Sequence, residues 1–168
     1  HNDGAVLERS FNLEGGRVNI GSGGMDISDA SKTYLSINLG SGTLGAYANW
    51  ASSSAITLTA GQTTFDTLDS VDNTTARTIT LSGVLSGAGG VIKEGDGSLS
   101  LSGANTYTGA TTIKKGILDV SGSIDSTSSL SIHNGATFKG AGLGTYTGDI
   151  TVTSEGSTAS ATLDGNAN

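Results

Sequence analysis

Short alternations of apolar and polar residues follow one another along the whole chain. Each has two apolar residues separated by one other residue, and a glycine follows within a few positions. An alternation of period two is typical of a β-strand that is buried on one side. The sequence therefore predicts an all-β chain. The pairs are Val18/Ile20, Ile37/Leu39, Ile56/Leu58, Ile79/Leu81, Leu99/Leu101, Leu118/Val120, Leu130/Ile132 and Ile150/Val152.

The spacing of these pairs is regular. The numbers of their first members differ in turn by 19, 19, 23, 20, 19, 12 and 20, by subtraction. Apart from the 12, which fits a second strand inside one unit, the period is near 20. A repeat of this length is typical of a β-solenoid, whose coils bury their inward residues against the coils on either side. We expect residues 1–168 to form a single parallel β-helix segment with about 20 residues per coil.

The densest stretch is Lys93 to Val120, which we interpret as one coil. Three alternations, Leu99/Leu101, Thr111/Ile113 and Leu118/Val120, lie there between turns that contain glycine. Five of its apolar residues should point inward, namely Leu99, Leu101, Ile113, Leu118 and Val120. Four of its charged residues should lie on the surface or at corners, namely Glu94, Asp96, Lys114 and Lys115.

Asn105 in this stretch has two interpretations. It could point inward at a corner and bind backbone groups of its own and neighbouring coils, or it could be an ordinary exposed turn residue. The sequence leaves both open.

Composition agrees with a thin core that continues along an axis. The chain has 27 glycines, no proline, no cysteine, 35% hydrophobic and only 5% aromatic residues. Glycine and serine in excess also occur in disordered linkers, but the regular apolar pairs argue against disorder here. The absence of cysteine excludes a disulfide framework and thiolate metal sites.

Net charge and the length of the apolar runs argue against two classes of partner, nucleic acids and a membrane interior. The formal net charge is -7, and lysine and arginine occur without a basic stripe, so nucleic-acid binding is not expected. No run approaches the roughly 18 apolar residues of a membrane span, so we do not expect the chain to cross a membrane.

Residues 95–120, GDGSLSLSGANTYTGATTIKKGILDV, resemble a known repeat. The pattern is similar to the autotransporter-associated β-strand repeat, also called the passenger-associated transport repeat, of bacterial type V secreted proteins. Residues 79–122 are the best-matching part, and Ser98 and Ile117 are minor departures. The pattern is carried by Gly97, Leu99, Leu101, Gly103, Asn105, Tyr107, Gly109, Ile113, Gly116, Leu118 and Val120.

The resemblance implies a right-handed parallel β-helix that is secreted or displayed on the bacterial surface. In such proteins the repeat aids export and folding and forms an adhesin-like stalk, with no catalytic role and no cofactor. Anchoring in the outer membrane would then depend on a part outside this chain. The expected partners are neighbouring coils of a larger parent protein, with a second copy or host and matrix glycans as further candidates.

Carbohydrate binding or cleavage is the alternative, because parallel β-helices also carry polysaccharide-active sites. Such a site needs carboxylates, or aromatic rings for sugar stacking, that converge in one groove. Asp66, Asp69 and Asp72 could gather around Ca²⁺ in a loop, although in a strand they would alternate between faces, and solvated corner residues are the simpler interpretation.

An aromatic cluster is the second candidate site. Tyr47, Trp50 and Phe65 are close in the sequence and could stack on sugar rings. Alternatively, Trp50 and Phe65 close the core, since aromatic residues are scarce in this chain.

Overall fold

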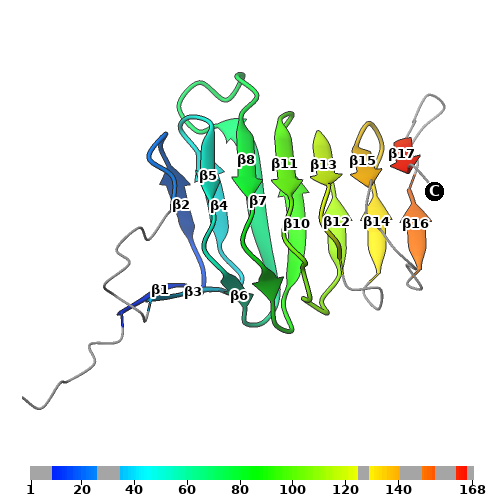
Figure 1. Cartoon of the computed structure of the whole chain (residues 1–168). Helices are drawn as coiled ribbons and strands as arrows, with labels where there is room; N and C mark the ends of the chain where they lie inside the picture. Colours follow the sequence, from blue (N-terminus) through cyan, green and yellow to red (C-terminus); the bar gives the residue numbers. More distant parts are fainter. Residues whose placement is uncertain (1–8, 26–34, 125–128, 141–148, 154–161, 166–168) are drawn as a thin grey trace, which may run out of the picture.

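The strands of the chain stack in a row and form a parallel β-helix (Figure 1). The computed structural model describes residues 9–25, 35–124, 129–140, 149–153 and 162–165, and these contain strands but no helix. The strands are β1 (Arg9–Leu13), β2 (Arg17–Ile20), β3 (Leu35–Leu39), β4 (Thr43–Ala46), β5 (Trp50–Ser52), β6 (Ile56–Leu58), β7 (Gln62–Asp69), β8 (Thr78–Leu81), β9 (Leu85–Ser86), β10 (Gly90–Glu94), β11 (Ser98–Leu101), β12 (Thr111–Ile113), β13 (Ile117–Val120), β14 (Leu130–Ile132), β15 (Thr137–Gly140), β16 (Ile150–Val152) and β17 (Thr162–Gly165).

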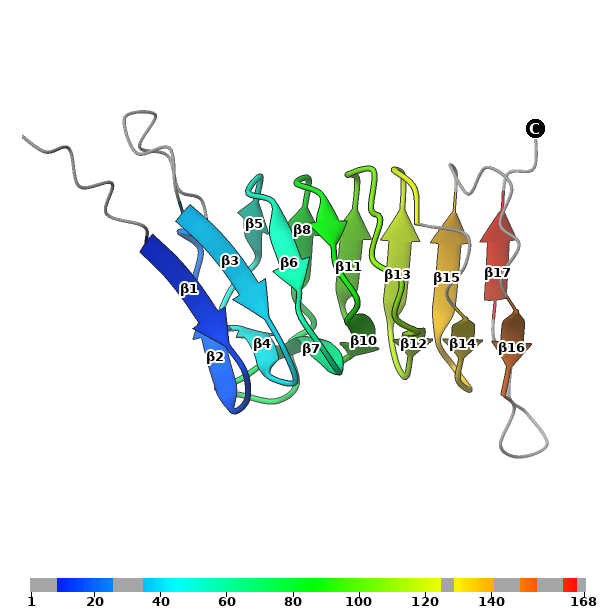
Figure 2. The ribbon, with the colours of Figure 1, turned by 90° about the horizontal axis from the view of Figure 1, so that it is seen from below.

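Successive coils place their strands in three parallel sheets. One sheet has the order β1-β3-β6-β9, the second β16-β14-β12-β10-β7-β4-β2, and the third β17-β15-β13-β11-β8-β5. Figure 2 shows β1, β3 and β6 side by side over the first coils. Non-consecutive strands pair throughout, as expected when each turn of the chain returns to the strand position it left one coil before. The predicted all-β fold and the parallel β-helix are confirmed.

The pairing register gives the coil length directly. Leu99 pairs with Ile79 and with Leu118, and these residue numbers differ by 20 and 19. Val91 pairs with Thr111, and the difference is again 20. Some coils are longer: the numbers of the partners Arg17 and Thr43 differ by 26, those of Thr137 and Thr162 by 25, and those of Trp50 and Ile79 by 29. In the coil from Trp50 to Ile79 the extra residues form the end of β7 and the loop between β7 and β8.

Two details of the sequence interpretation were wrong. Residues 93–120 are more than one coil, because Leu99 and Leu118 occupy neighbouring strands of the same sheet and are already one full turn apart. The apolar pairs are also not all equivalent: Ile37 lies in the β1 sheet, whereas Ile79 lies in the β8 sheet. Several of the spacings counted in the sequence therefore joined different sides of the solenoid.

Among the described residues, the side that begins with β1 has no strand after β9. The segment after β11 still stacks on the coil before it, since the Thr106 and Thr108 amides donate to the carbonyls of Leu85 and Gly87 at 2.8 and 2.9 Å. The backbone of this segment is not a regular strand. Its amide groups nevertheless form hydrogen bonds with the preceding coil, as they would in a parallel sheet.

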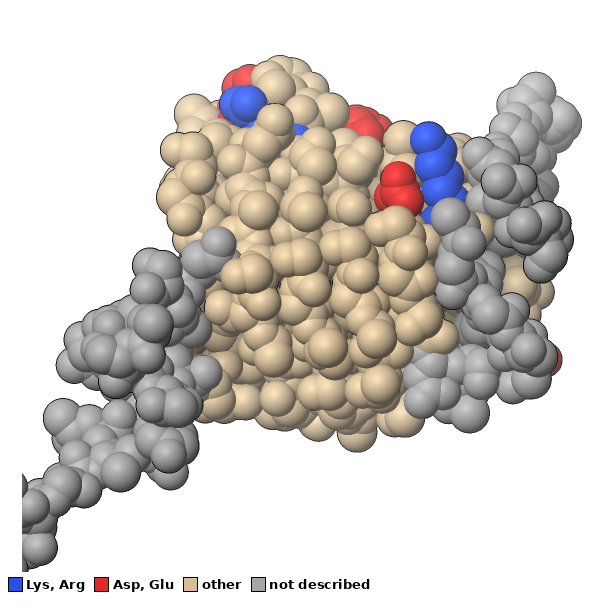
Figure 3. Space-filling view, viewed as in Figure 1, with Lys and Arg blue, Asp and Glu red and all other residues tan. Residues whose placement is uncertain are grey.

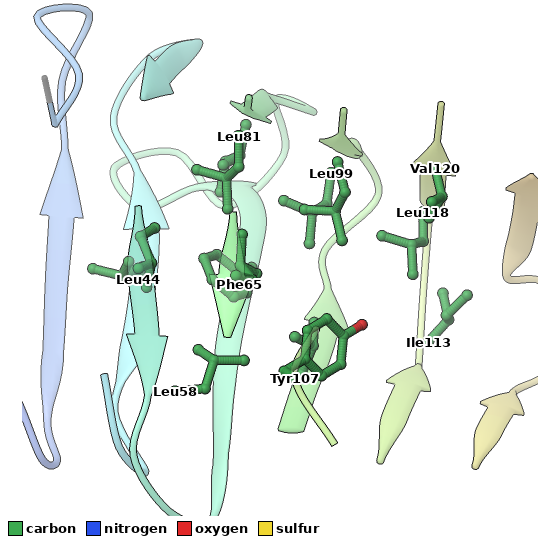
Figure 4. Packing of buried hydrophobic residues seen from close by; sticks show 14 of the residues in the cluster. Leu44, Leu58, Phe65, Leu81, Leu99, Tyr107, Ile113, Leu118 and Val120 are labelled. Carbon is green, nitrogen blue, oxygen red and sulfur yellow. The ribbon is translucent and has the colours of Figure 1, made fainter. Parts of the chain in front are cut away.

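The core is a column of inward side chains that runs the length of the stack (Figure 4). In β11 and β13 the burial alternates along the strand, with Leu99, Leu101, Leu118 and Val120 fully enclosed and their neighbours partly exposed. Ile113 and Tyr107 fill the same interior from the other sides. The inward orientation expected from the alternation is what the structure shows.

Glycines of this region let turns of adjacent coils touch through their backbones. A Cβ on Gly97 would overlap the carbonyl oxygen of Arg77, and one on Gly109 would overlap the backbone of Gly89. These contacts are with main-chain atoms that cannot swing aside. Glycine is therefore required at these positions for lack of space.

The first prediction concerns Gly97. Gly97→Ala should lower the free energy of unfolding by about 2 kcal/mol or more, because the added methyl group forces two coils apart. Gly15→Ala is the matched control, since a Cβ there meets no atom within 4 Å. Urea unfolding followed by circular dichroism measures both variants, and equal stability of the two would contradict the role of close stacking.

Candidate functional site

The most distinctive chemistry of the chain lies inside the coils of residues 91–120. All eleven residues named for the repeat fall in this stretch, in β11, β12 and β13, in the turns between them and, for Gly97, in the turn before β11. They pack the core, allow close turns or bind backbone groups.

Asn105 points inward and is 1% exposed. Its Oδ1 accepts the Leu85 amide at 2.9 Å, and its Nδ2 donates to the carbonyls of Gly103 and Ser123, each at 2.9 Å. These partners belong to the coil before, its own coil and the coil after. Of the two interpretations open from the sequence, the structure shows the inward one.

Tyr107 is fully buried, and its phenol oxygen lies 2.7 Å from Oγ1 of Thr111. This hydrogen bond connects the irregular segment after β11 with the first residue of β12. A buried hydroxyl with a partner avoids the desolvation cost of an unpaired one.

Lys93 is the feature that sequence reasoning missed. Its side chain is 0% exposed, in register with Phe65 in β7 and Ile113 in β12. The ammonium Nζ donates to three backbone carbonyls, those of Glu94, Gly95 and Lys115, at 2.9, 2.8 and 2.9 Å. A lysine two positions after Val91 has the inward parity of the strand, and this parity was the signal available in the sequence.

Three carbonyls match the three donors of an ammonium group, so the buried cation is fully satisfied. Burial nevertheless lowers the pKa of Lys93 from 10.5 to about 8, against the opposing influence of Asp66, Asp96 and Glu94. Desolvation of the charge thus outweighs the nearby carboxylates. Gly116 leaves the necessary room, because a Cβ on it would come within 2.8 Å of Nζ.

Ion pairs on the outside run along the axis. Lys114 binds Glu94 at 2.7 Å and Lys115 binds Asp96 at 2.8 Å, each pair joining successive coils. All four side chains are at least 38% exposed, and pairs of this kind contribute roughly 0.2–1 kcal/mol.

A third ion pair on the outer surface connects two coils that are separated by one intervening coil. Arg17 in β2 reaches Asp66 in β7 at 2.8 Å, and its Nε also donates to Asn19 at 2.7 Å. Gly45 of the intervening β4 makes this path available, since a Cβ there would lie 2.5 Å from the guanidinium.

Asp66, Asp69 and Asp72 do not converge. Asp66 binds Arg17, and Asp69 is 3% exposed and binds the guanidinium of Arg77. Hydrogen bonds, first from the Val71 amide and then from Arg77, lower the pKa of Asp69. The pKa of Asp72 is lowered by hydrogen bonds from Thr75 and Thr74. Within the described ranges, no three His, Cys, Asp or Glu side chains gather as a metal site would need.

The three candidate aromatic residues are also separated. Phe65 is 0% and Trp50 3% exposed, so both rings lie in the core and are closed to a ligand. Tyr47 alone of the three is open, with 49% of its surface exposed. Two buried polar atoms in the described part of the chain lack a hydrogen-bond partner, Nε1 of Trp50 and Oγ of Ser70.

The outer surface carries few charges. Figure 3 shows a broad face without lysine, arginine or acidic side chains over most of its area. Among the residues described, no helix is long and apolar enough to pass through a bilayer.

Comparison with known proteins agrees with this geometry. Residues 91–120 match the family described as "Passenger-associated-transport-repeat". The chain carries this repeat. The matched residues begin in β10 and end with β13, so they include Lys93, Asn105 and the two turns that enclose the ammonium group.

Two relatives extend the likeness beyond the repeat. The chain is 45% identical over 58 residues to the extracellular serine protease of Serratia marcescens, and 40% identical over 77 residues to the BmaC autotransporter adhesin of Brucella suis biovar 1 (strain 1330). These stretches are 34% and 46% of this chain but only 5% and 2% of those proteins. No solved structure gives a significant match. The matches support a segment of a secreted or surface passenger.

The passenger-associated transport repeat should respond to pH through Lys93. Its pKa is lower in the folded chain than in the unfolded chain, so between about pH 8 and 10.5 the unfolded chain holds more protons. The free energy of unfolding contributed by this group is therefore constant below pH 8 and rises with pH across that window, by a few kcal/mol in all.

Urea unfolding of the native chain and Lys93→Met between pH 7 and 10 tests this. The stability of the native chain relative to Lys93→Met should rise as pH increases above about 8. Lys114→Met, at an exposed lysine, is the control and should show no such trend. If the stability difference between the native chain and Lys93→Met stayed constant or fell as pH rises, the lowered pKa of Lys93 would be contradicted.

Asn105 gives a second test within the repeat. Asn105→Ala leaves the Leu85 amide unpaired, whereas the carbonyls of Gly103 and Ser123 keep their backbone amide donors. The substitution should cost about 1–3 kcal/mol. Thr106→Ala, at the exposed neighbouring position, should change stability by less than about 0.5 kcal/mol. Thermal unfolding of both variants measures the contrast; a mild effect of Asn105→Ala would show that water replaces the side chain.

Proposed function

We propose that this chain is a structural stalk or scaffold segment of a bacterial passenger that is secreted or displayed on the cell surface. In this role the repeat aids export and folding, the segment itself is not an enzyme, and the parent protein acts as an adhesin. The observation that carries the proposal is the unbroken axial stack, in which residues 91–120 are packed and hydrogen-bonded to the coils on both sides.

The acidic residues support a scaffold. Asp66, Asp69, Glu94 and Asp96 each bind a basic side chain. Three of these pairs link different coils, so the carboxylates are used to hold the stack together. A glycosidase needs two carboxylates directed at one bond.

The relation to the parent protein is part of the proposal. Residues 1–168 would be one β-helix segment of a larger surface protein, with residues 79–122 as its best-matching repeat unit. The contacts that matter for such a segment are with neighbouring coils of that parent. Anchoring in the outer membrane would then be provided by a different part of it.

The test compares an inward and an outward substitution in the full-length parent protein. Leu101→Asp places a carboxyl group at a 0% exposed position, and it should destabilise the coils by several kcal/mol and reduce the folded passenger at the cell surface. Ser102→Asp, at the exposed neighbouring residue, should leave both unchanged. Surface labelling and protease resistance of intact cells measure the outcome.

Two results would contradict this function. One is normal display of a protease-resistant passenger carrying Leu101→Asp. The other is cleavage of a polysaccharide by the purified chain that is lost on Glu94→Ser/Asp96→Ser without a change in melting temperature, which would favour the carbohydrate-active alternative.

A further inference from the structure

The loop between β7 and β8 carries an exposed asparagine, Asn73, near its tip. The chain doubles back there as an antiparallel turn. The Asp69 amide donates to the Thr75 carbonyl at 2.8 Å, and the Asn73 amide donates to the Asp69 carbonyl at 2.9 Å. Residues 70–77 project from the row of strands (Figure 1). Asn73 is therefore held away from the contacts between stacked coils.

Asn73 has the sequence context of an asparagine glycosylation site. Residues 73–75 read Asn-Thr-Thr, which fits the acceptor pattern Asn-x-Ser/Thr with a middle residue other than proline. No other asparagine of the chain is followed by serine or threonine two positions later, although both residue types are abundant. A pattern this short also occurs by chance, so its structural setting decides whether it can act as an acceptor.

The side-chain amide of Asn73 is exposed and makes no hydrogen bond among the described residues. Other asparagines are engaged. Asn12 and Asn38 bond to each other at 2.7 Å, and Asn49 accepts a backbone amide at 2.9 Å. Asn105 is buried with three backbone partners. The asparagine that fits the acceptor pattern is thus one whose Nδ2 is open to a reagent.

Neighbouring groups fix the backbone around the acceptor. Asp72 Oδ1 accepts the amides of Thr74 and Thr75 at 2.8 and 2.9 Å, and the Thr75 hydroxyl bonds to the other oxygen of the same carboxylate. Asn73 has a φ of 51°, in the left-handed region that asparagine and glycine adopt most readily. This turn by itself favours asparagine or glycine at position 73, and a glycine variant separates that role from modification.

We propose that Asn73 is an acceptor for N-linked glycosylation, with a sugar diphosphate linked to a nucleotide or to a lipid as the donor. In the transfer, Nδ2 of Asn73 forms a bond to C1 of the sugar, and the bond between C1 and the diphosphate oxygen breaks. The diphosphate leaves with the bonding electron pair, and the amide proton passes to a base of the transferase. No oxidant or reductant is needed.

A sugar is a bulky, solubilising group, and the loop between β7 and β8 has room for one. It projects from the stack, so a glycan on it leaves the contacts between coils intact (Figure 1). The modification goes beyond the scaffold role, because Asn73 lies outside residues 91–120 and takes no part in axial packing.

Mass spectrometry of the full-length parent protein from its native host tests the proposal. Cleavage after lysine and arginine and before aspartate releases residues 69–77 or 72–77, and either peptide contains a single asparagine. The peptide should carry the added mass of a sugar, and fragmentation should place that sugar on Asn73. An unmodified peptide, or a sugar on Thr74 or Thr75, would overturn the proposal.

Three variants of the parent protein separate the acceptor pattern from the turn. Asn73→Gly keeps the left-handed conformation and removes the acceptor, so it should fold, as circular dichroism checks, and lose the sugar. Thr75→Val removes the hydroxyl that the pattern needs and should also lose the sugar, whereas Thr75→Ser should retain it. A sugar that persists on Thr75→Val would show that the pattern does not direct the modification.

Blocking export of the parent protein distinguishes the two donors. A sugar already present on the retained protein indicates a nucleotide-linked donor, and a sugar present only after export indicates a lipid-linked donor. Both outcomes support Asn73 as the acceptor, and a sugar on neither form overturns it. None of these results bears on surface display of the Leu101→Asp protein, so the two proposals fail separately.

Discussion

In the coils that have a neighbour on both sides, inward side chains stack on their counterparts in the coils before and after them, and the rest of the structure depends on this axial stacking. The column Ile79, Leu99, Leu118 and Phe138 shows it most simply, since the four residues are consecutive register partners and are all fully buried. With strands only about 4.8 Å apart, a side chain cannot be enlarged without moving the coil above it. The same spacing requires glycine wherever two turns meet through their backbones.

Two polar side chains of the repeat, Asn105 and Lys93, enter this interior with complete sets of partners. Asn105 uses both ends of its amide, and Lys93 uses all three of its donors. The Lys93 column also contains Phe65 and Ile113, so the aliphatic stem of the lysine continues the apolar packing while its head reaches the turn. An unpaired donor or acceptor at either position would cost more than the bond contributes.

Much of this could be read from the sequence, because a period of two within strands and of about 20 between coils follows from the geometry of the stack. The inward residues of β11 and β13 were predictable from parity alone. The assignment of pairs to sheets was not, since Ile56 and Ile79 look alike in sequence but lie on different sides of the solenoid. For the same reason their spacing of 23 concealed the longest coil and the inserted loop within it.

The candidate site was partly hidden for a different reason. Lysine at an inward position contradicts the usual surface preference of a charged residue, and only the carbonyls of two successive turns make it tolerable. Those turns are a whole coil apart in the chain and meet only in three dimensions. Tyr47 stood out by its type, but its separation from Trp50 and Phe65 depends on which side of the strand each occupies.

The acceptors of Lys93 also have a consequence for how the protein is assembled. Glu94 and Gly95 belong to the same turn as the lysine, but the third carbonyl, that of Lys115, arrives with the following coil. The ammonium group therefore has all three acceptors only where the following coil is docked. A following coil docked out of register would leave the buried charge without the Lys115 carbonyl, so the lysine favours the observed register.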